Sequence, residues 1–360
     1  MNLSVFFFSF SSLIGTGAFL LPFALSQYGW ISILFFSITS IMFVYMGYIL
    51  TKIHPFKILM EYNNQFTIFC INWIYWLISW ISTSVILMEI YNYICPFYNI
   101  NPMLLYIFLI SICIFINLFG IKISVRIEKY ITIVKFIPLL ICIISIIYLP
   151  KYNILPIYNN NFNILYSIKK CFIRGVWCYV GIENISIIAP SIKKEYQLDV
   201  IFGVILAAIL YISILICTYM VLPVIYLQSY MQITALLFKT PIVGSILVIL
   251  VCIGSLNSWI VGSGYLGYEN SKNNIFPSFF SIVNKYSTPY YSIILSSVLL
   301  IPIMYISTYY PNFIFTIVDQ SSSIILLFYI YLLLLYSIKY KSILSIICAI
   351  LFSLLLHMSV

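Results

Sequence analysis

The chain has 360 residues, of which 64% are hydrophobic and only 7% are charged, whereas soluble domains carry about 25% charged residues. With a mean hydropathy of +1.12, this composition excludes a soluble globular protein and predicts an all-α polytopic membrane protein. The net charge of +9 comes without a clustered basic face, so we attribute most of it to membrane topology and expect no nucleic-acid partner.

Eleven windows of about 20 apolar residues, the length that crosses a bilayer, follow one another along the chain. These windows cover residues 3–25, 28–50, 66–93, 103–121, 131–149, 171–190, 200–226, 240–267, 288–308, 312–336 and 342–359. The first window lacks a basic n-region and a small-residue cleavage site, so we interpret it as a span of the mature protein, and not as a signal peptide.

The basic residues between these windows predict the orientation of the chain. With the N-terminus in the cytoplasm, 11 of the 17 Lys and Arg residues fall in inner loops and 4 in outer loops, which follows the positive-inside rule. No loop is long enough for a soluble domain, so we expect residues 1–360 to form one transmembrane domain, located in the cell inner (plasma) membrane. The nine cysteines lie mostly inside the windows without a CxxC pair, so no disulfide, metal site or cofactor is expected.

Two windows are interrupted at mid-depth by polar residues and glycines. They are the first, at SSLIGTG (residues 11–17), and the sixth, at RGVWCYVGIENISI (residues 174–187). In lipid a broken helix is tolerated only where its free backbone groups line a cavity or meet protein. Paired breaks in corresponding positions of two halves are typical of transporters with inverted repeats. We therefore predict a first repeat over about residues 1–149, a second over about 171–336, and a peripheral helix at about 342–359.

The breaks also suggest how a ligand is held. After Gly15, Thr16 and Gly17 the chain starts a half-helix whose first N–H groups lack partners, and these can bind a carboxylate. Carbonyl groups left free near Val180 and Gly181 could hold an ammonium group, so the two breaks together would grip the backbone of an amino acid. The alternative is a small-residue face that only packs two helices closely.

Four sequence segments resemble a known family. The segments IGTGAFLLP followed by YGW, YWLISWIS (residues 75–82), VWCYVGIEN (residues 176–184) and GSLNSWIVGSG (residues 254–264) are similar to the amino acid-polyamine-organocation (APC) superfamily. They are most similar to its basic amino acid and polyamine antiporters, such as the arginine-agmatine exchanger. The resemblance runs from about Ser11 to Tyr336. It implies a five-plus-five inverted-repeat fold in which spans one and six are discontinuous. Relatives form homodimers with a twelfth span that is not among the eleven predicted here, so dimer formation is left open.

The resemblance also implies the residues of a substrate cavity. These are Leu13, Gly15, Thr16, Gly17, Trp177, Cys178, Val180 and Trp259. Thr83 stands where the arginine exchanger carries an amide side chain, so recognition of a guanidinium group does not follow. For both tryptophans the alternative is packing or an interfacial belt.

Ionisable residues inside spans are energetically unfavourable and each needs a reason. Glu183 follows the sixth-span break and matches a family carboxylate beside the substrate path, where it could carry a proton; alternatively it caps freed backbone groups. Lys135, in ITIVKFIPLL, matches proton-coupled relatives whose lysine replaces a bound cation; alternatively it extends to the inner interface.

Three further charges lie near the outer ends of spans. Arg174 lies one helical turn before Trp177, and we expect it to form a structural or interfacial ion pair, with Glu89 as a candidate partner. Asp319, in VDQSSSI, is expected to cap the start of the tenth span, where the resemblance implies the outer gate.

These observations predict an amino acid permease that works by alternating access, as an exchanger or by proton symport. Its partners would be an amino acid or amine, protons and membrane lipid. One alternative is a receptor that keeps the binding site without transport. Another is an intramembrane enzyme, but the spans contain neither HExxH nor paired aspartates, and His54 and His357 lie near span ends.

Overall fold

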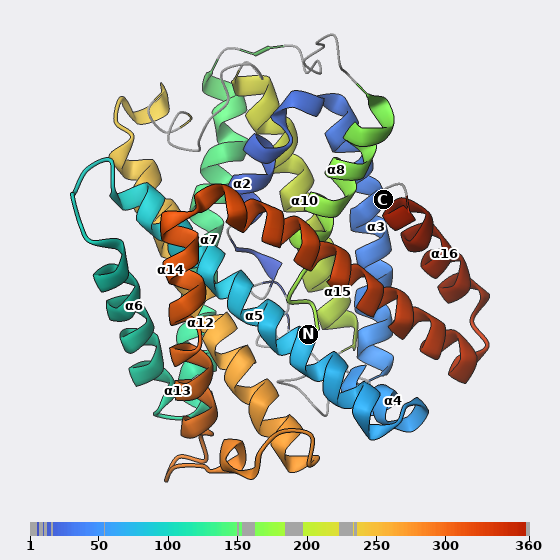
Figure 1. Ribbon diagram of the computed structural model, residues 1–360. Coiled ribbons are helices and arrows are strands. Elements are labelled where there is room, and N and C mark those ends of the chain that lie inside the picture. The colour runs from blue at the N-terminus through green and yellow to red at the C-terminus, as the bar shows by residue number, and fades with distance from the viewer. Residues whose placement is uncertain are drawn as a thin grey trace.

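The computed structural model describes residues 6, 10, 13–15, 17–53, 55–149, 151–152, 163–183, 197–222, 233 and 236–357. Within these ranges all regular structure is helical, as Figure 1 shows. The all-α prediction is therefore confirmed.

Eight helices form most of the bundle in the described ranges. They are α3 (Trp30–Lys52), α5 (Gln65–Ile94), α6 (Pro102–Asn117), α7 (Ile121–Tyr148), α10 (Gln197–Val221), α12 (Ile242–Lys272), α15 (Pro311–Tyr340) and α16 (Ile343–His357). The shorter elements are α2 (Gly17–Ala24), η1 (Ser26–Tyr28), α4 (Pro55–Tyr62), α8 (Ile164–Trp177), η4 (Ser278–Ser281), α13 (Tyr290–Val298) and α14 (Ile301–Tyr309).

Asparagine caps set the starts of three of these helices. The side chain of Asn64 accepts a hydrogen bond from the Thr67 amide before α5. Asn101 and Asn163 each accept two amide hydrogen bonds in the first turns of α6 and α8. Asparagine is favoured at such positions because its side chain satisfies N–H groups that have no partner in the helix.

The apolar windows fold as membrane-spanning helices. Within the described residues, seven helical segments are long and apolar enough to cross a bilayer, with α13 and α14 together forming one of them. Two further windows fold as the shorter apolar helices Pro102–Asn117 and Ile343–Leu356. The first and sixth windows are the interrupted ones, and their described residues include the short helix α2 and the end of the short helix α8. The chain is therefore a multi-pass membrane protein, while the number of eleven spans stays a prediction.

The helices pack around the two interrupted spans. α12 packs against α5, α7 and α13, and α10 packs against α3 and α7. α8 packs against α3 and α15, and α2 against α10 and α8. In Figure 1, α2 and α8 lie toward the top of the bundle and α4 lies at the bottom.

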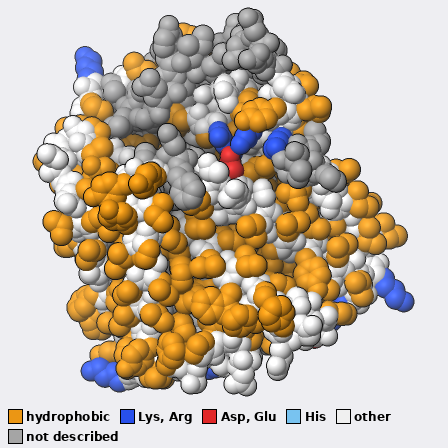
Figure 2. All heavy atoms as spheres, viewed as in Figure 1, with side chains coloured by type: hydrophobic (Ala, Val, Ile, Leu, Met, Phe, Trp, Pro, Cys, Tyr) orange, Lys and Arg blue, Asp and Glu red, His pale blue; other side chains and the backbone are white. Residues whose placement is uncertain are grey.

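The surface of the bundle is mostly apolar. Large side chains such as Ile41, Phe66 and Ile147 are at least 71% exposed, and hydrophobic atoms dominate the face seen in Figure 2. Such a surface is unfavourable in water but matches a hydrocarbon environment.

Candidate functional site

The first span is interrupted between Leu13 and Gly17. Leu13 is helical, Ile14 and Gly15 are not, and α2 begins at Gly17. The carbonyl of Leu13 accepts a hydrogen bond from the Tyr211 hydroxyl at 2.7 Å, and the carbonyl of Ile14 accepts one from Ser255 Oγ at 3.2 Å. Side chains from α10 and α12 thus replace the helical hydrogen bonds that the break removes.

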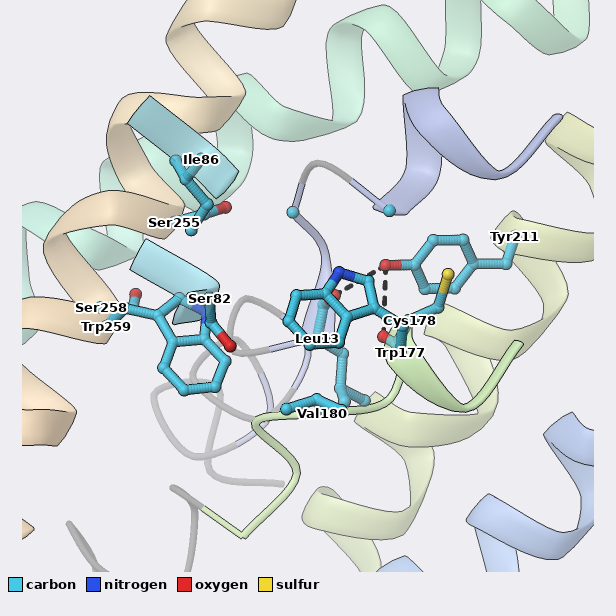
Figure 3. A pocket seen from close by; sticks show the side chains of 12 residues that line it. Leu13, Ser82, Ile86, Trp177, Cys178, Val180, Tyr211, Ser255, Ser258 and Trp259 are labelled. Carbon is cyan, nitrogen blue, oxygen red and sulfur yellow. Dashed lines mark hydrogen bonds between the residues drawn. The ribbon is translucent and has the colours of Figure 1, made fainter. Parts of the chain in front are cut away.

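The sixth span is interrupted directly after Trp177. α8 ends there, and the chain continues as turns to Glu183, with Gly181 at a φ of 109° that favours glycine. The carbonyl of Cys178 lies 3.5 Å from the Tyr211 hydroxyl. One tyrosine side chain therefore touches the backbone of both breaks, as the dashed lines of Figure 3 show. The prediction that spans one and six are discontinuous is confirmed.

Two glycines allow the breaks to approach their neighbours closely. A Cβ atom on Gly17 would lie 2.9 Å from Cys178 Sγ, and one on Gly15 would lie 3.1 Å from Ser255 Oγ. A side chain at Gly17 would therefore push the two breaks apart. Glycine in the middle of this span is explained by close packing of its backbone against the side chains of Cys178 and Ser255.

A pocket lies between the two breaks and helices α5, α10 and α12. Its lining residues are Leu13, Gly15, Gly17, Ser82, Ile86, Trp177, Cys178, Val180, Tyr211, Ser255, Ser258 and Trp259. In the view of Figure 3, the Trp177 ring lies between Tyr211 on one side and Trp259 and Ser82 on the other. We call this space the central pocket.

Seven of the predicted cavity residues line the central pocket: Leu13, Gly15, Gly17, Trp177, Cys178, Val180 and Trp259. Thr16 lies outside the described residues. Thr83 is buried but does not line the pocket; its hydroxyl donates to the Ser79 carbonyl at 2.8 Å. Ser82, one position earlier on α5, lines the pocket in its place.

The sequence reasoning missed the other polar residues of the pocket. Ser255 and Ser258 precede Trp259 by four and one positions, inside the segment that carried the family resemblance, so helical spacing could have identified at least Ser255. Tyr211 is one of 32 tyrosines and shares its apolar window with Tyr219 and Tyr226, so nothing in the sequence distinguishes it. Among the described lining residues there are hydroxyl groups, aromatic rings and backbone, but no charged side chain.

Glu183 lies just beyond the central pocket and is fully buried. It accepts hydrogen bonds from the hydroxyls of Tyr75 on α5 and Tyr329 on α15, the latter at 2.5 Å, and from the Gly181 amide at 3.2 Å. The carboxyl group therefore links the sixth-span break to two long helices. The sequence predicted this residue but not its tyrosine partners.

Lys135 is fully buried in α7. A Cβ atom on Gly254 of α12 would lie 2.8 Å from its Cε atom, so the lysine packs where α7 and α12 meet. This burial contradicts the alternative that the side chain extends to the inner interface. Lys135 does not line the central pocket.

Arg174 forms an ion pair, as the sequence predicted, but its partner is Asp319. Asp319 Oδ2 lies 2.7 Å from Lys170 Nζ, and its Oδ1 lies 3.7 Å from Arg174 Nε. The candidate pairing of Arg174 with Glu89 was therefore wrong. The helix-cap role for Asp319 was also wrong, because α15 begins at Pro311 and Asp319 lies more than two turns into it.

A second cavity lies on the other side of Trp177. It shares Gly17, Trp177 and Cys178 with the central pocket and is otherwise lined by Leu20, Leu21, Ala24, Val85, Arg174, Val318 and Asp319. We call this cavity the vestibule. The indole of Trp177 therefore forms part of the wall between the central pocket and the vestibule.

Comparisons with known proteins agree with this architecture. The sequence profile of a family described as amino acid permease matches residues 2–358. An arginine/ornithine antiporter of Latilactobacillus sakei is 26% identical over an alignment of 259 residues, and the match covers 65% of this chain and 54% of the relative. The chain thus spans about half the length of the curated relative that it matches.

Among solved structures, the fold is similar to that of Mhp1, a nucleobase-cation-symport-1 family transporter in a closed conformation with bromovinylhydantoin bound. The TM-score is 0.56 at 13% identity, and the match covers 93% of this chain and 77% of the other. At this identity the likeness concerns the fold alone.

Proposed function

This chain belongs to the amino acid permease family, and on that basis we propose that it is a secondary transporter that carries amino acids across the inner (plasma) membrane. The mechanism is alternating access, in which the two repeats move around a fixed site near the bilayer midplane. The observation that supports it best is the central pocket between the two breaks, where Tyr211 contacts the backbone of both.

In this proposal the backbone binds the constant part of the substrate. The amide groups at the start of α2, around Gly15 to Gly17, bind the carboxylate, because the first N–H groups of a helix lack partners and carry partial positive charge. The carbonyl groups near Val180 bind the ammonium group. Hydroxyl groups of Ser82 and Ser258 and the rings of the two tryptophans face the substrate side chain.

Trp177 acts as the cover of the bound substrate. It lines both the central pocket and the vestibule, so a change of its side-chain position opens or closes the path between them. An aromatic ring in this place also offers apolar contact area and a π-face to the substrate.

Energy coupling is either exchange of one substrate for another or symport with protons. Glu183 and Lys135 are the candidates for coupling, because each is a fully buried ionisable residue beside a break or beside the helices that pack on it. Their positions fit a role in conformational change better than direct substrate contact, because neither lines the central pocket.

The proposal is tested by transport in proteoliposomes. The purified full chain is reconstituted, and uptake of the twenty amino acids and of polyamines is measured with and without internal substrate, and with and without a pH gradient. Exchange or pH-driven uptake of at least one amino acid is expected. Binding of an amino acid without either kind of uptake would refute the transporter and favour a receptor.

A further inference from the structure

The vestibule carries an uneven set of charges. Arg174 and Asp319 line it, and Lys170 binds the same carboxylate from the side. Two cations therefore share one carboxylate, at 2.7 Å and 3.7 Å. The three side chains are 20 to 28% exposed, so this group keeps a net positive charge at the edge of the cavity.

Arg174 is fixed in this position by a second contact. Its Nη1 atom donates to the carbonyl of Ala24, the last residue of α2, at 2.6 Å. A cation at a helix C-terminus is favoured because the last carbonyl groups have no partner in the helix. The guanidinium group thus stays beside the vestibule when Asp319 is bound to Lys170.

Among the described residues that line the vestibule, Asp319 is the only one with a carboxylate. Of the eight acidic residues of the whole sequence, five lie in or beside the predicted inner loops: Glu61, Glu128, Glu195, Asp199 and Glu269. Glu183 is buried below the central pocket, and Glu89 is buried in α5 and does not line the vestibule. The sequence instead places Lys151, Lys169 and Lys239 in the predicted outer loops.

From this arrangement we propose that the vestibule is an electrostatic filter that admits zwitterionic amino acids and disfavours basic amino acids and polyamines. The inference rests on the proposed transport function and names the substrate class of that site. A zwitterion carries a carboxylate that the excess positive charge attracts. Ornithine or a polyamine adds a further ammonium group that the same charge repels.

The physical effect depends on where the charges lie. Repulsion between unit charges a few ångströms apart is weak in bulk water but several-fold stronger at the effective dielectric of a protein surface. A cavity with apolar walls, here Leu20, Leu21 and Val318, concentrates the field of the charges at its rim. The filter therefore acts before the substrate reaches the central pocket, which contains no described charged side chain.

The experiment compares two substrates in the same proteoliposomes. Initial rates are measured for ornithine and for the zwitterionic amino acid that the wild-type chain carries fastest, and the two kcat/KM values are expressed as a ratio. The wild-type ratio of ornithine to zwitterion is expected to be below 1. Lys170→Gln leaves one cation for one carboxylate and should raise this ratio about tenfold, as removal of one nearby unit charge implies.

Three controls separate the filter from a general effect of charge or folding. Lys170→Arg keeps the charge and should keep the wild-type ratio. Lys239→Gln removes a predicted outer cation that does not line the vestibule and should leave the ratio unchanged. Asp319→Asn removes the carboxylate and should change the ratio in the opposite direction to Lys170→Gln. Higher salt should reduce the wild-type discrimination, because exposed charges are screened.

Either of two results would overturn the filter while leaving the transporter intact. One is a wild-type chain that carries ornithine as efficiently as the zwitterion, and the other is equal ratios in wild type and Lys170→Gln. A chain that carries neither substrate under any condition would refute the proposed function, and the filter with it.

Discussion

The contact between Gly17 and Cys178 allows a prediction about stability. Whether Gly17→Ala raises or lowers the free energy of unfolding depends on how closely the two breaks pack. Gly17 is the first residue of α2, and an added Cβ atom would lie 2.9 Å from Cys178 Sγ and 3.4 Å from Tyr211 Oη. Cys178 is only 4% exposed, so its sulfur has little room to move. Gly17→Ala should therefore separate the two breaks.

Two opposing effects set the magnitude. Alanine is better than glycine in a helix by up to about 1 kcal/mol, so without the contact the substitution would stabilise the chain. Overpacking in a buried site costs about 1–3 kcal/mol. We expect a net destabilisation of about 1–2 kcal/mol. If the two breaks bind the substrate, their separation should also weaken substrate binding.

The double variant Gly17→Ala with Cys178→Ala tests the cause. Removing the sulfur makes space for the new methyl group, so the coupling energy between the two substitutions should be about 1–2 kcal/mol and favourable. Thermal unfolding in detergent and substrate binding are measured for both single variants and the double variant. If Gly17→Ala is neutral, or if Cys178→Ala does not relieve it, the packing argument is refuted.

Three other substitutions test the proposed roles of single residues. Trp177→Leu should weaken substrate binding by at least about tenfold, because an aromatic contact of about 0.5–1.5 kcal/mol is lost together with the cover of the pocket; calorimetric titration measures it. Lys135→Ala should abolish pH-driven uptake and leave exchange between internal and external substrate, as measured in the same proteoliposomes. Tyr329→Phe removes one hydrogen bond to Glu183 and should lower the free energy of unfolding by about 1–3 kcal/mol, as thermal unfolding measures.

Each of these predictions has an outcome that contradicts it. Wild-type substrate affinity in Trp177→Leu would show that the indole does not contribute to substrate binding. An unchanged pH dependence in Lys135→Ala would argue against coupling through this lysine. Tyr331→Phe serves as the matched control for Tyr329, because Tyr331 Oη bonds Asn63 and not Glu183. Equal stabilities of the two tyrosine variants would indicate that the buried carboxyl group adds nothing specific.

The sequence predicted the breaks because they depend on local chemistry, whereas most of the pocket residues were predicted from the family resemblance. Glycine and polar residues in the middle of an apolar window leave backbone groups unsatisfied, and lipid cannot satisfy them. The positions next to the breaks, such as Gly17, Trp177 and Val180, must therefore lie beside a cavity or packed protein. That reasoning needs no knowledge of distant segments.

The partners of the breaks could not be predicted because they come from distant helices. Tyr211 meets Leu13 across 198 residues, and Tyr329 meets Glu183 across 146 residues. Both tyrosines stand in apolar windows with no pattern of their own. The prediction for Asp319 was wrong for a related reason. Its role depends on where α15 begins and on which cations of α8 lie beside it.

Trp177, which separates the central pocket from the vestibule, is linked through the backbone to the contacts of both Tyr211 and Glu183. Trp177 is the last residue of α8, so its backbone position depends on the turns that follow. In those turns, Cys178 contacts Tyr211, and Glu183 accepts hydrogen bonds from Tyr75 and Tyr329. A movement of the sixth-span break would therefore shift the indole and the buried carboxyl group together. Under the proposed mechanism, one movement of this segment would open the path from the vestibule and weaken the contacts of Glu183 with Tyr75 and Tyr329. The two changes would then be coupled through the backbone of the break itself.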